Sequence, residues 1–161
     1  MNILGISGLA HESTVSLVRD GAIVAAVSEE RLSRVKNQGG FPSRSLDMVL
    51  GLGGIRMEDV DLVAHPFFTA KQELAMQVRC LKDDLAFTLG NGEPLSRRLV
   101  HVLNYLRITY LAGDFGPADR ALEQGLAERG LLDRLQRVDH QLAHVASAVF
   151  TSGFDRCLGV S

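Results

Sequence analysis

The amino-acid sequence predicts an α/β fold, and three observations carry this prediction. The first thirty residues alternate apolar and polar side chains with a period of two, which is typical of strands. From Thr69 onward the apolar residues recur with helical spacing instead. Hydrophobic residues make up 46% and charged residues 22% of the 161 residues, a balance typical of a globular chain of one domain's size.

Three strands are predicted at the N-terminus, over residues 2–6, 14–18 and 22–27. Asp20-Gly21 forms a tight turn between the second and third, because Gly21 can adopt positive φ. Strands joined by short turns pair with their neighbours. The chain is therefore predicted to open with a three-stranded antiparallel meander.

A helix and a buried strand are predicted next. Ser43 is the expected N-cap of a helix over residues 44–52, which Gly53-Gly54 ends. Residues 60–64 form a short apolar segment that stops at Pro66, as a buried strand would.

The rest of the chain is predicted to be mainly helical. Three helices are expected at residues 69–90, from Pro94 to Gly113, and at about 118–129. The apolar stripes of the first two are Leu74, Val78, Leu81, Leu85 and Leu89, and then Leu99, Val102, Leu103, Leu106 and Ile108. A strand at 135–138, a helix at 140–150 and a final strand at 157–160 complete the prediction.

Composition argues against several classes of partner. The formal net charge of −2 gives the chain no general attraction for nucleic acid. No apolar run approaches ~18 residues, the length that a membrane span needs. Cys80 and Cys157 lie far apart in the sequence, which does not suggest a disulfide framework. We therefore expect a soluble, cytoplasmic protein without a nucleic-acid or membrane partner.

Two histidines are the first candidate for chemistry. His140 and His144 lie one helical turn apart, so both imidazoles can reach one divalent ion. The glutamate that follows the first histidine in zinc proteases is absent. The alternative is a pair of partly buried histidines whose ring nitrogens bond to the backbone.

The loop between the first two strands is the second candidate. Small residues in the segment 8–14 can present backbone N–H groups to a phosphate, with Ser13 adding a hydroxyl. His11 and Glu12 would form a proton-transfer pair at its tip. The alternative is a polar hairpin turn.

The basic segment after the third strand is the third candidate. Arg31 and Lys36 could bind an anionic group, because arginine can grip such a group with two hydrogen bonds. The alternative is a solvated charged loop, in which Glu29 or Glu30 pairs with Arg31 or Arg34.

Taken together and in order, these motifs resemble those of a known family. They are Asn2-Ile3-Leu4-Gly5-Ile6, His11-Glu12-Ser13, Asp20-Gly21-Ala22, Glu29-Glu30-Arg31, Arg34-Val35-Lys36, Phe41-Pro42, Asp139-His140-Gln141-Leu142-Ala143-His144 and Ser152-Gly153-Phe154. The chain resembles the N-terminal part of the O-carbamoyltransferases of the NodU/CmcH type. The resemblance is dense over residues 1–45 and 138–161 and weak between them.

The resemblance implies the first half of a ribonuclease-H-like, actin-like ATPase fold, related to tRNA threonylcarbamoyl transferases. Such a half contains the meander, parallel strands and helices, here with a helical insertion at about 69–130. The family's C-terminal half and its YrdC-like domain would be absent. It also implies carbamoyl phosphate and ATP as inputs, a carbamoyl-adenylate intermediate, and a hydroxylated small molecule as acceptor.

The resemblance assigns roles to eight residues. His140 and His144 match the metal ligands, with iron the family's metal, and His11 with Glu12 matches the catalytic loop. Ser13, Glu30, Arg31 and Lys36 match positions around the carbamoyl and phosphate pocket.

Three positions depart from the family's pattern. Glu12 stands where an aspartate is usual, Asn37 where a histidine is usual, and Gln141 where a second histidine often follows the first metal ligand. The family's next element, an Asp-Gly loop that supplies an aspartate to the metal, would follow Ser161.

Three hypotheses follow. The first is a fragment or subunit of a carbamoyltransferase in biosynthesis, inactive until its missing C-terminal half or a complementary subunit is present. The second is a truncated, non-catalytic binding or assembly module of the same fold. The third is an enzyme of another class on this fold, such as a sugar kinase, which the segments at 29–31 and 41–42 disfavour.

Overall fold

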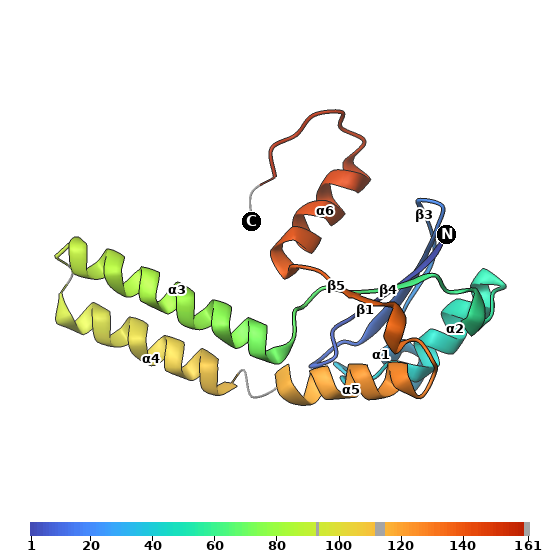
Figure 1. Ribbon diagram of the computed structural model, residues 1–161, viewed down its shortest axis with the longest axis horizontal. Helices are drawn as coiled ribbons and strands as arrows, with labels where there is room; N and C mark the ends of the chain where they lie inside the picture. The colour runs from blue at the N-terminus through green and yellow to red at the C-terminus, as the bar shows by residue number, and fades with distance from the viewer. Residues whose placement is uncertain (93, 112–114, 160–161) are drawn as a thin grey trace.

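A computed structural model describes residues 1–92, 94–111 and 115–159, and it contains one five-stranded mixed sheet (Figure 1). The strand order across the sheet is β3-β2-β1-β4-β5. The strands are β1 (Asn2–Ser7), β2 (Thr14–Arg19), β3 (Ala22–Ser28), β4 (Leu62–His65) and β5 (Leu135–Arg137). Helices lie between and beyond these strands, so the predicted α/β class is confirmed.

The predicted antiparallel meander is present at one side of the sheet. β1 pairs with β2 and β2 with β3, both antiparallel. Asp20 and Gly21 turn the chain between β2 and β3 with φ angles of 51° and 83°. Two consecutive positive φ angles match the right-handed twist of the strands, which explains why Gly21 stands in the turn.

The other side of the sheet is parallel. β1 pairs with β4 and β4 with β5 in the same direction. The observed bounds of these two strands differ from the predicted ones. β4 begins at Leu62, two residues later than predicted, and β5 ends at Arg137, one residue earlier than predicted. The carboxyl ends of β1, β4 and β5 consequently point to the same edge of the sheet, where ligands bind in open α/β sheets.

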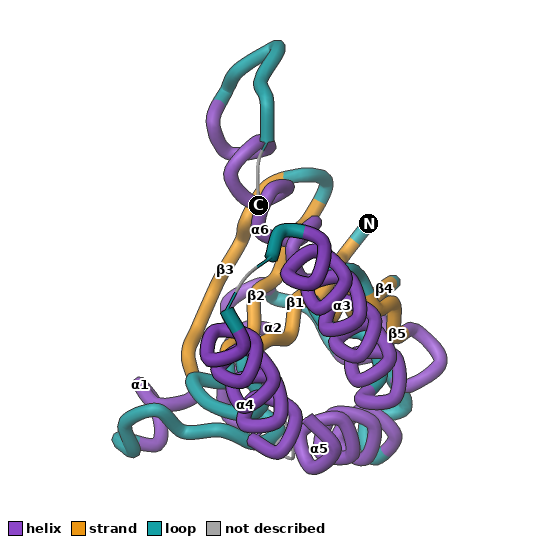
Figure 2. Tube along the Cα trace, turned by 90° about the vertical axis from the view of Figure 1, so that its left-hand side faces the viewer, coloured by secondary structure: helices purple, strands orange, loops and turns teal. Residues whose placement is uncertain are grey.

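The hydrophobic core lies on one face of the sheet, beneath two helices. α2 (Ser43–Gly53) packs against β2 and β3, and α5 (Phe115–Ala127) contributes further core residues (Figures 1 and 2). Alternate strand residues face this core because successive side chains of a strand point to opposite faces. The core contains Leu4, Ile6, Val15, Leu17, Leu46, Val49, Val63, Leu122 and Leu126, among others.

The start of α2 differs from the prediction. Pro42 occupies the N-cap position, and Ser43 is the first helical residue rather than the cap. The Glu29 carboxylate instead accepts hydrogen bonds from the backbone N–H groups of Arg44, at 3.3 Å, and Ser45, at 2.8 Å. Glu29 itself begins a short helix, α1 (Glu29–Ser33), which the sequence analysis did not predict.

Two long helices form a hairpin that projects away from the sheet (Figure 1). α3 (Ala70–Gly90) packs against α4 (Leu95–Leu111). The stripe on α3 is only partly covered, since Leu74 is 46% and Val78 43% exposed. The side chains of Leu89, Leu106 and Ile108, together with Gly113, lie outside the described part.

The predicted strand at 157–160 is wrong over residues 157–159, which form no strand; Val160 lies outside the described residues. α6 (His140–Ser152) carries the chain away from the sheet, so no strand edge is at hand to take its backbone hydrogen bonds (Figure 1). Among the described residues, no helix combines the length and apolar character that crossing a bilayer requires.

Candidate functional site

A cavity of about 680 Å³ lies at the carboxyl edge of the sheet. It is bounded by the end of β1 at Ser7, the following loop with His11, the segment after β4 with Pro66 and Phe67, and the first turn of α6. Thr14 and Ser28, from β2 and β3, add hydroxyl groups. The cavity therefore occupies the place that the parallel strands favour for ligands.

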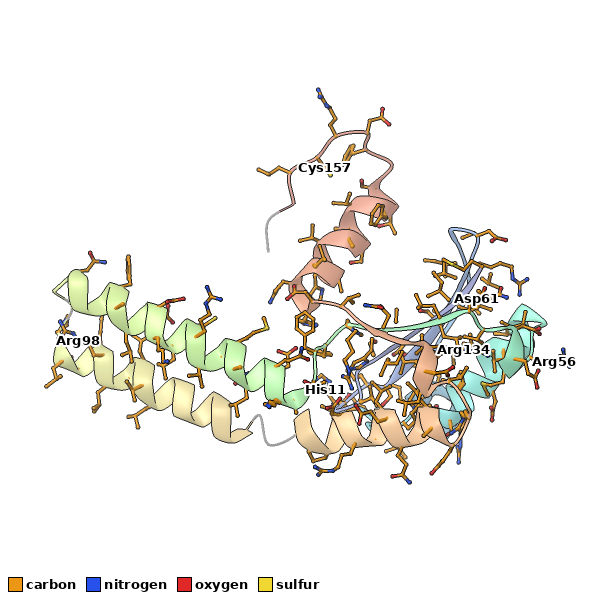
Figure 3. The ribbon with its side chains drawn as sticks, in the orientation of Figure 1. His11, Arg56, Asp61, Arg98, Arg134 and Cys157 are labelled. Atoms are coloured by element: carbon orange, nitrogen blue, oxygen red, sulfur yellow. The ribbon has the colours of Figure 1, made fainter. Side chains whose placement is uncertain are left out.

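Six of the eight predicted site residues line this cavity: His11, Glu12, Glu30, Arg31, His140 and His144. They come from three segments that are far apart in the sequence. Figure 3 shows His11 at the end of the sheet, beside the start of α3. Ser13 and Lys36 do not line the cavity.

Ser13 is fully buried and holds two loops together rather than facing the cavity. Its hydroxyl lies 2.7 Å from the Gly40 carbonyl oxygen and 3.3 Å from that of Gly8. Its backbone N–H donates to the Gln38 carbonyl at 2.9 Å. Ser13 thus links residues 38–40, which follow the basic segment, to the loop that carries His11.

Gly8 sets the path of the loop that carries His11 and Glu12. Its φ is +71°, and a Cβ atom there would lie 2.5 Å from the Glu12 carbonyl oxygen and 2.7 Å from that of His11. Contacts this short do not occur at real Cβ atoms, so only glycine fits this path. Glu12 also adopts a positive φ of 57°. The loop therefore presents His11 and Glu12 in a constrained conformation.

His140 and His144 share one face of α6, and their Nε2 atoms lie 3.0 Å apart. His140 Nδ1 lies 3.2 Å from the Pro66 carbonyl oxygen, which can only accept a hydrogen bond. The proton therefore sits on Nδ1 in the neutral ring, and Nε2 keeps its lone pair. Such a backbone bond also fixes the orientation of metal-binding histidines.

The two imidazoles fit a metal ion as part of a ligand set. Both Nε2 atoms are close enough to bind one ion, and the ring of His140 is held in place from behind. Within the described ranges, no group of three or more His, Cys, Asp or Glu residues is arranged to hold a metal. Further ligands would have to come from elsewhere.

Phe67 is a site residue that the sequence analysis did not select. Its ring stacks on His140 with centroids 4.3 Å apart and planes at 18°. Its position directly after β4 was the available signal, because residues at the carboxyl ends of parallel strands lie at the ligand-binding edge.

Glu30 and Arg31, both from α1, line the cavity. Arg31 pairs with Glu30 at 3.5 Å and is 77% exposed, so its guanidinium can reorient toward a ligand. Glu30 also accepts the backbone N–H of Asn37 at 3.0 Å. Lys36, next to Asn37, is exposed outside the cavity. The charged-loop alternative predicted that Glu29 or Glu30 pairs with Arg31 or Arg34. Glu30 does pair with Arg31, whereas the Glu29 carboxylate caps α2.

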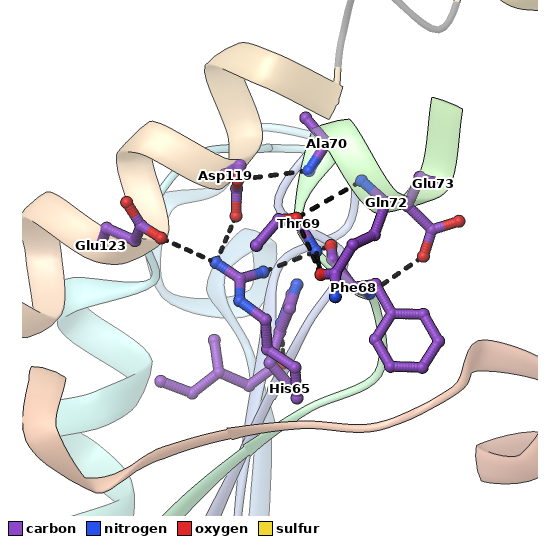
Figure 4. A network of polar contacts seen from close by, with 10 residues as sticks. His65, Phe68, Thr69, Ala70, Gln72, Glu73, Asp119 and Glu123 are labelled. Atoms are coloured by element: carbon purple, nitrogen blue, oxygen red, sulfur yellow. Dashed lines mark hydrogen bonds and ion pairs between the residues drawn. The ribbon is translucent and has the colours of Figure 1, made fainter. Parts of the chain in front are cut away.

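A polar network supports the segment that carries Phe67 (Figure 4). Arg137, from β5, forms ion pairs with Asp119 and Glu123 of α5 and donates to the Phe68 carbonyl at 3.3 Å. Asp119 in turn accepts the backbone N–H of Ala70 at 3.3 Å. These contacts join β5, α5 and the start of α3.

His65, the last residue of β4, is buried beneath this network. Its Nδ1 lies 2.8 Å from the Ile6 carbonyl oxygen. Burial lowers the pKa of the His65 imidazole, an effect that the Ile6 hydrogen bond opposes. His65 is therefore a neutral ring near neutral pH.

Comparisons with known proteins find relatives that match most of the chain. Residues 2–158 match the family described as Carbamoyltransferase N-terminus. The chain is 34% identical over 163 residues to the protein sll1178 of Synechocystis sp., which covers 96% of this chain and 24% of that protein. It is 32% identical over 148 residues to the nodulation protein NolNO of Sinorhizobium fredii, covering 92% and 18%.

The matched length shows that this chain corresponds to only a part of those proteins. The chain spans about a quarter or less of the length of these two relatives. The family match extends over nearly all of the described residues and includes every residue that lines the cavity. The chain belongs to the carbamoyltransferase family and corresponds to the N-terminal part of its members.

Proposed function

We propose that this chain is the N-terminal fragment or subunit of an O-carbamoyltransferase that uses ATP and carbamoyl phosphate. The complete assembly would move a carbamoyl group to the hydroxyl of a small-molecule acceptor in secondary metabolism. The observation that carries the proposal is the convergence of His11, Arg31 and the two α6 histidines on one cavity. The family membership supplies the reaction class.

The cavity contains groups suited to such a transfer. His11 and Glu12 lie 3.9 Å apart, measured from Nδ1 to Oε2, so the carboxylate lies close to the positive charge that would develop on the ring during proton transfer. His11 Nε2 would then take the proton from the attacking acceptor hydroxyl. Arg31 would bind phosphate oxygens of the donor after leaving Glu30.

A divalent metal, iron by resemblance, would be held by the Nε2 atoms of His140 and His144. When bound, it would supply positive charge that polarises an oxygen of the substrate. For both lone pairs to face the ion, the His144 proton must reside on Nδ1. Phe67 would keep the His140 ring in position by stacking against it.

We propose further that the sheet forms the first half of an actin-like ATPase domain, with a helical insertion at about 69–130. A meander on one side and two parallel pairings on the other support this placement. A cytoplasmic location is supported by two exposed cysteines that are free thiols in the described chain.

Complementation tests the proposal. The chain is mixed with the C-terminal remainder of NolNO, produced without its own N-terminal part, and supplied with ATP, radiolabelled carbamoyl phosphate and a panel of sugars and hydroxylated metabolites. We expect carbamoyl transfer by the mixture and none by either part alone. Turnover by the isolated chain would contradict the proposed dependence on a second part.

Matched variants give the test its control. We expect His11→Gln to lower complemented turnover at least ~100-fold, the usual contribution of a general base. Lys71→Gln, an exposed change on α3 away from the cavity, should leave turnover unchanged. Complex formation without any turnover would favour the non-catalytic module instead, and transfer to tRNA would favour a threonylcarbamoyl-type relative.

A further inference from the structure

The outermost strand of the sheet, β3, has an unpaired edge. The strand order places β3 at one end of the sheet beside β2, and Figure 2 shows it along the outer side. Apart from its bonds to β2, the backbone of residues 22–28 makes no hydrogen bond to any residue that the structure describes. A row of backbone N–H and C=O groups is therefore available to pair with a further strand.

β3 lacks most of the features that protect edge strands from association, which are charges, proline, a bulge or a short length. Its seven residues include no proline and no charged side chain, whereas β5, at the opposite edge, has only three residues. A register shift opposite Leu17 and Val18 marks a bulge near the start of β3. Residues 25–28 follow in regular register, so this part of the strand remains suitable for pairing.

Apolar side chains accompany this edge. On β3 itself, Ile23 is 68% and Val24 40% exposed. α2 packs against β2 and β3, so it covers the sheet close to the same edge. Its Met48 and Leu52 are 43% and 62% exposed and lie one helical turn apart on one face. The edge thus combines unpaired backbone groups with apolar side chains from a strand and from a helix.

A second copy of this chain fits these features. Two β3 strands that pair antiparallel about a two-fold axis offer each other the same backbone groups, which is the self-complementarity of a two-fold interface. Because β3 carries no charge, its side chains do not repel their copies, and they give no preference to a charged peptide. Since α2 lies over the two outermost strands, the same axis brings the α2 helices of both copies side by side over the joined sheet.

We propose that two copies of this chain associate through β3 and form one continuous sheet. Antiparallel pairing of the two β3 strands supplies the backbone hydrogen bonds, and Ile23, Met48 and Leu52 supply apolar contact. The association needs neither carbamoyl transfer nor a metal, because none of its contacts uses His11 or the two α6 histidines. Its failure and that of the proposed function are therefore separable.

Sedimentation equilibrium and NMR of the full chain test the proposal. We expect a reversible monomer–dimer equilibrium with a micromolar Kd, since a pair of edge strands is a small interface. Mixtures of ¹³C-labelled and unlabelled chain should show intermolecular Hα–Hα NOEs between β3 residues, which are diagnostic of antiparallel pairing. A chain that stays monomeric at high micromolar concentration, or a dimer without these NOEs, would overturn the proposal.

A lysine on the edge locates the interface. Ala26 is exposed in the regular part of β3, and Ala26→Lys should raise the dimer Kd at least ~tenfold, because pairing brings the two new charges close together. Leu99→Lys on α4 and Phe150→Lys on α6 are the matched controls, since both replace exposed apolar side chains on other surfaces. Both should dimerise as the wild type does.

The outcomes of these variants decide between surfaces. Unchanged dimerisation by a folded Ala26→Lys, or loss of the dimer in either control, would overturn the assignment of the interface to β3. If Ala26→Lys fails to fold, the intermolecular NOEs of the wild-type chain decide the matter.

Discussion

The carboxylate of Glu29 accepts the backbone N–H of Ser45 at 2.8 Å, although the two residues belong to different helices. Glu29 is only 4% exposed, and its other oxygen accepts the N–H of Arg44. A negative charge at this position satisfies two N–H groups that the first turn of a helix cannot satisfy itself. The contact fixes α2 against the end of β3, next to the residues that line the cavity.

Glu29→Gln should therefore destabilise the fold by about 1–2 kcal/mol, because the amide keeps only one acceptor and loses the charge. Urea denaturation of both proteins measures this difference. Asp47→Asn is the matched control on the exposed side of α2 and should change the free energy of unfolding by less than ~0.5 kcal/mol. Equal stability of Glu29→Gln and wild type would contradict the capping role.

The Arg137–Asp119 pair is expected to stabilise the junction of β5, α5 and α3. Both side chains are largely buried, at 13% and 20% exposure. Arg137→Met leaves the Asp119 charge without its partner and should cost about 3 kcal/mol. Adding Asp119→Leu to that variant should recover part of the loss. A double-mutant cycle by denaturation tests this, and additive effects would mean that the two residues do not interact.

Stability should depend on pH through His65. Burial lowers its folded-state pKa below the ordinary value of 6.5, so the unfolded chain binds more protons between the two values. The free energy of unfolding should thus rise with pH within that window and level off above about 6.5. His65→Gln should flatten this dependence. His101→Gln, at an exposed histidine on α4, should retain it, and a retained slope in His65→Gln would rule out His65 as its source.

Gly8→Ala should distort the loop that presents His11. The added Cβ meets two carbonyl oxygens, so we expect a loss of about 2–3 kcal/mol, including the strain of a positive φ. Gly21→Ala is the matched control, since its φ is +83° and nothing lies within 4 Å of the new atom. It should cost only about 1 kcal/mol. Thermal unfolding of both variants measures the difference, which reports the steric clash alone.

Metal affinity should depend on both α6 histidines. We expect His140→Gln and His144→Gln each to weaken Co²⁺ binding by at least tenfold, because each removes one of the two facing Nε2 donors. Titration calorimetry measures the affinities, with His101→Gln as the control histidine variant. Wild-type affinity in either α6 variant would exclude that residue as a ligand.

Local patterns in the sequence were sufficient to predict much of the fold. The meander follows from period-two alternation and the Asp20-Gly21 turn, which act between neighbouring residues. Residues 157–159 show the limit of this reasoning. Their apolar pattern suits a strand, but a strand needs a partner edge, and α6 leads the chain away from one.

The candidate site, like the fold, could be predicted from the sequence only where its geometry is local. The spacing of His140 and His144 determines that they share a helix face, because that relation is local to one helix. Ser13 was also predicted as a site residue, but it does not line the cavity, and its partners Gly40 and Gln38 reach it only in the folded chain. Lys36 was expected there too, but its side chain is exposed and does not line the cavity.

The sequence by itself determined which chemical groups this protein has and the local element on which each one stands. Only the tertiary structure decided that residues near positions 11, 30 and 140 meet at one cavity. It also decided that the Glu29 carboxylate caps α2 and that the buried His65 ring bonds to the Ile6 carbonyl oxygen. The reason is physical: helix and strand periodicity arises between near neighbours, whereas a cavity forms where parallel strands bring distant segments to the same edge of a sheet.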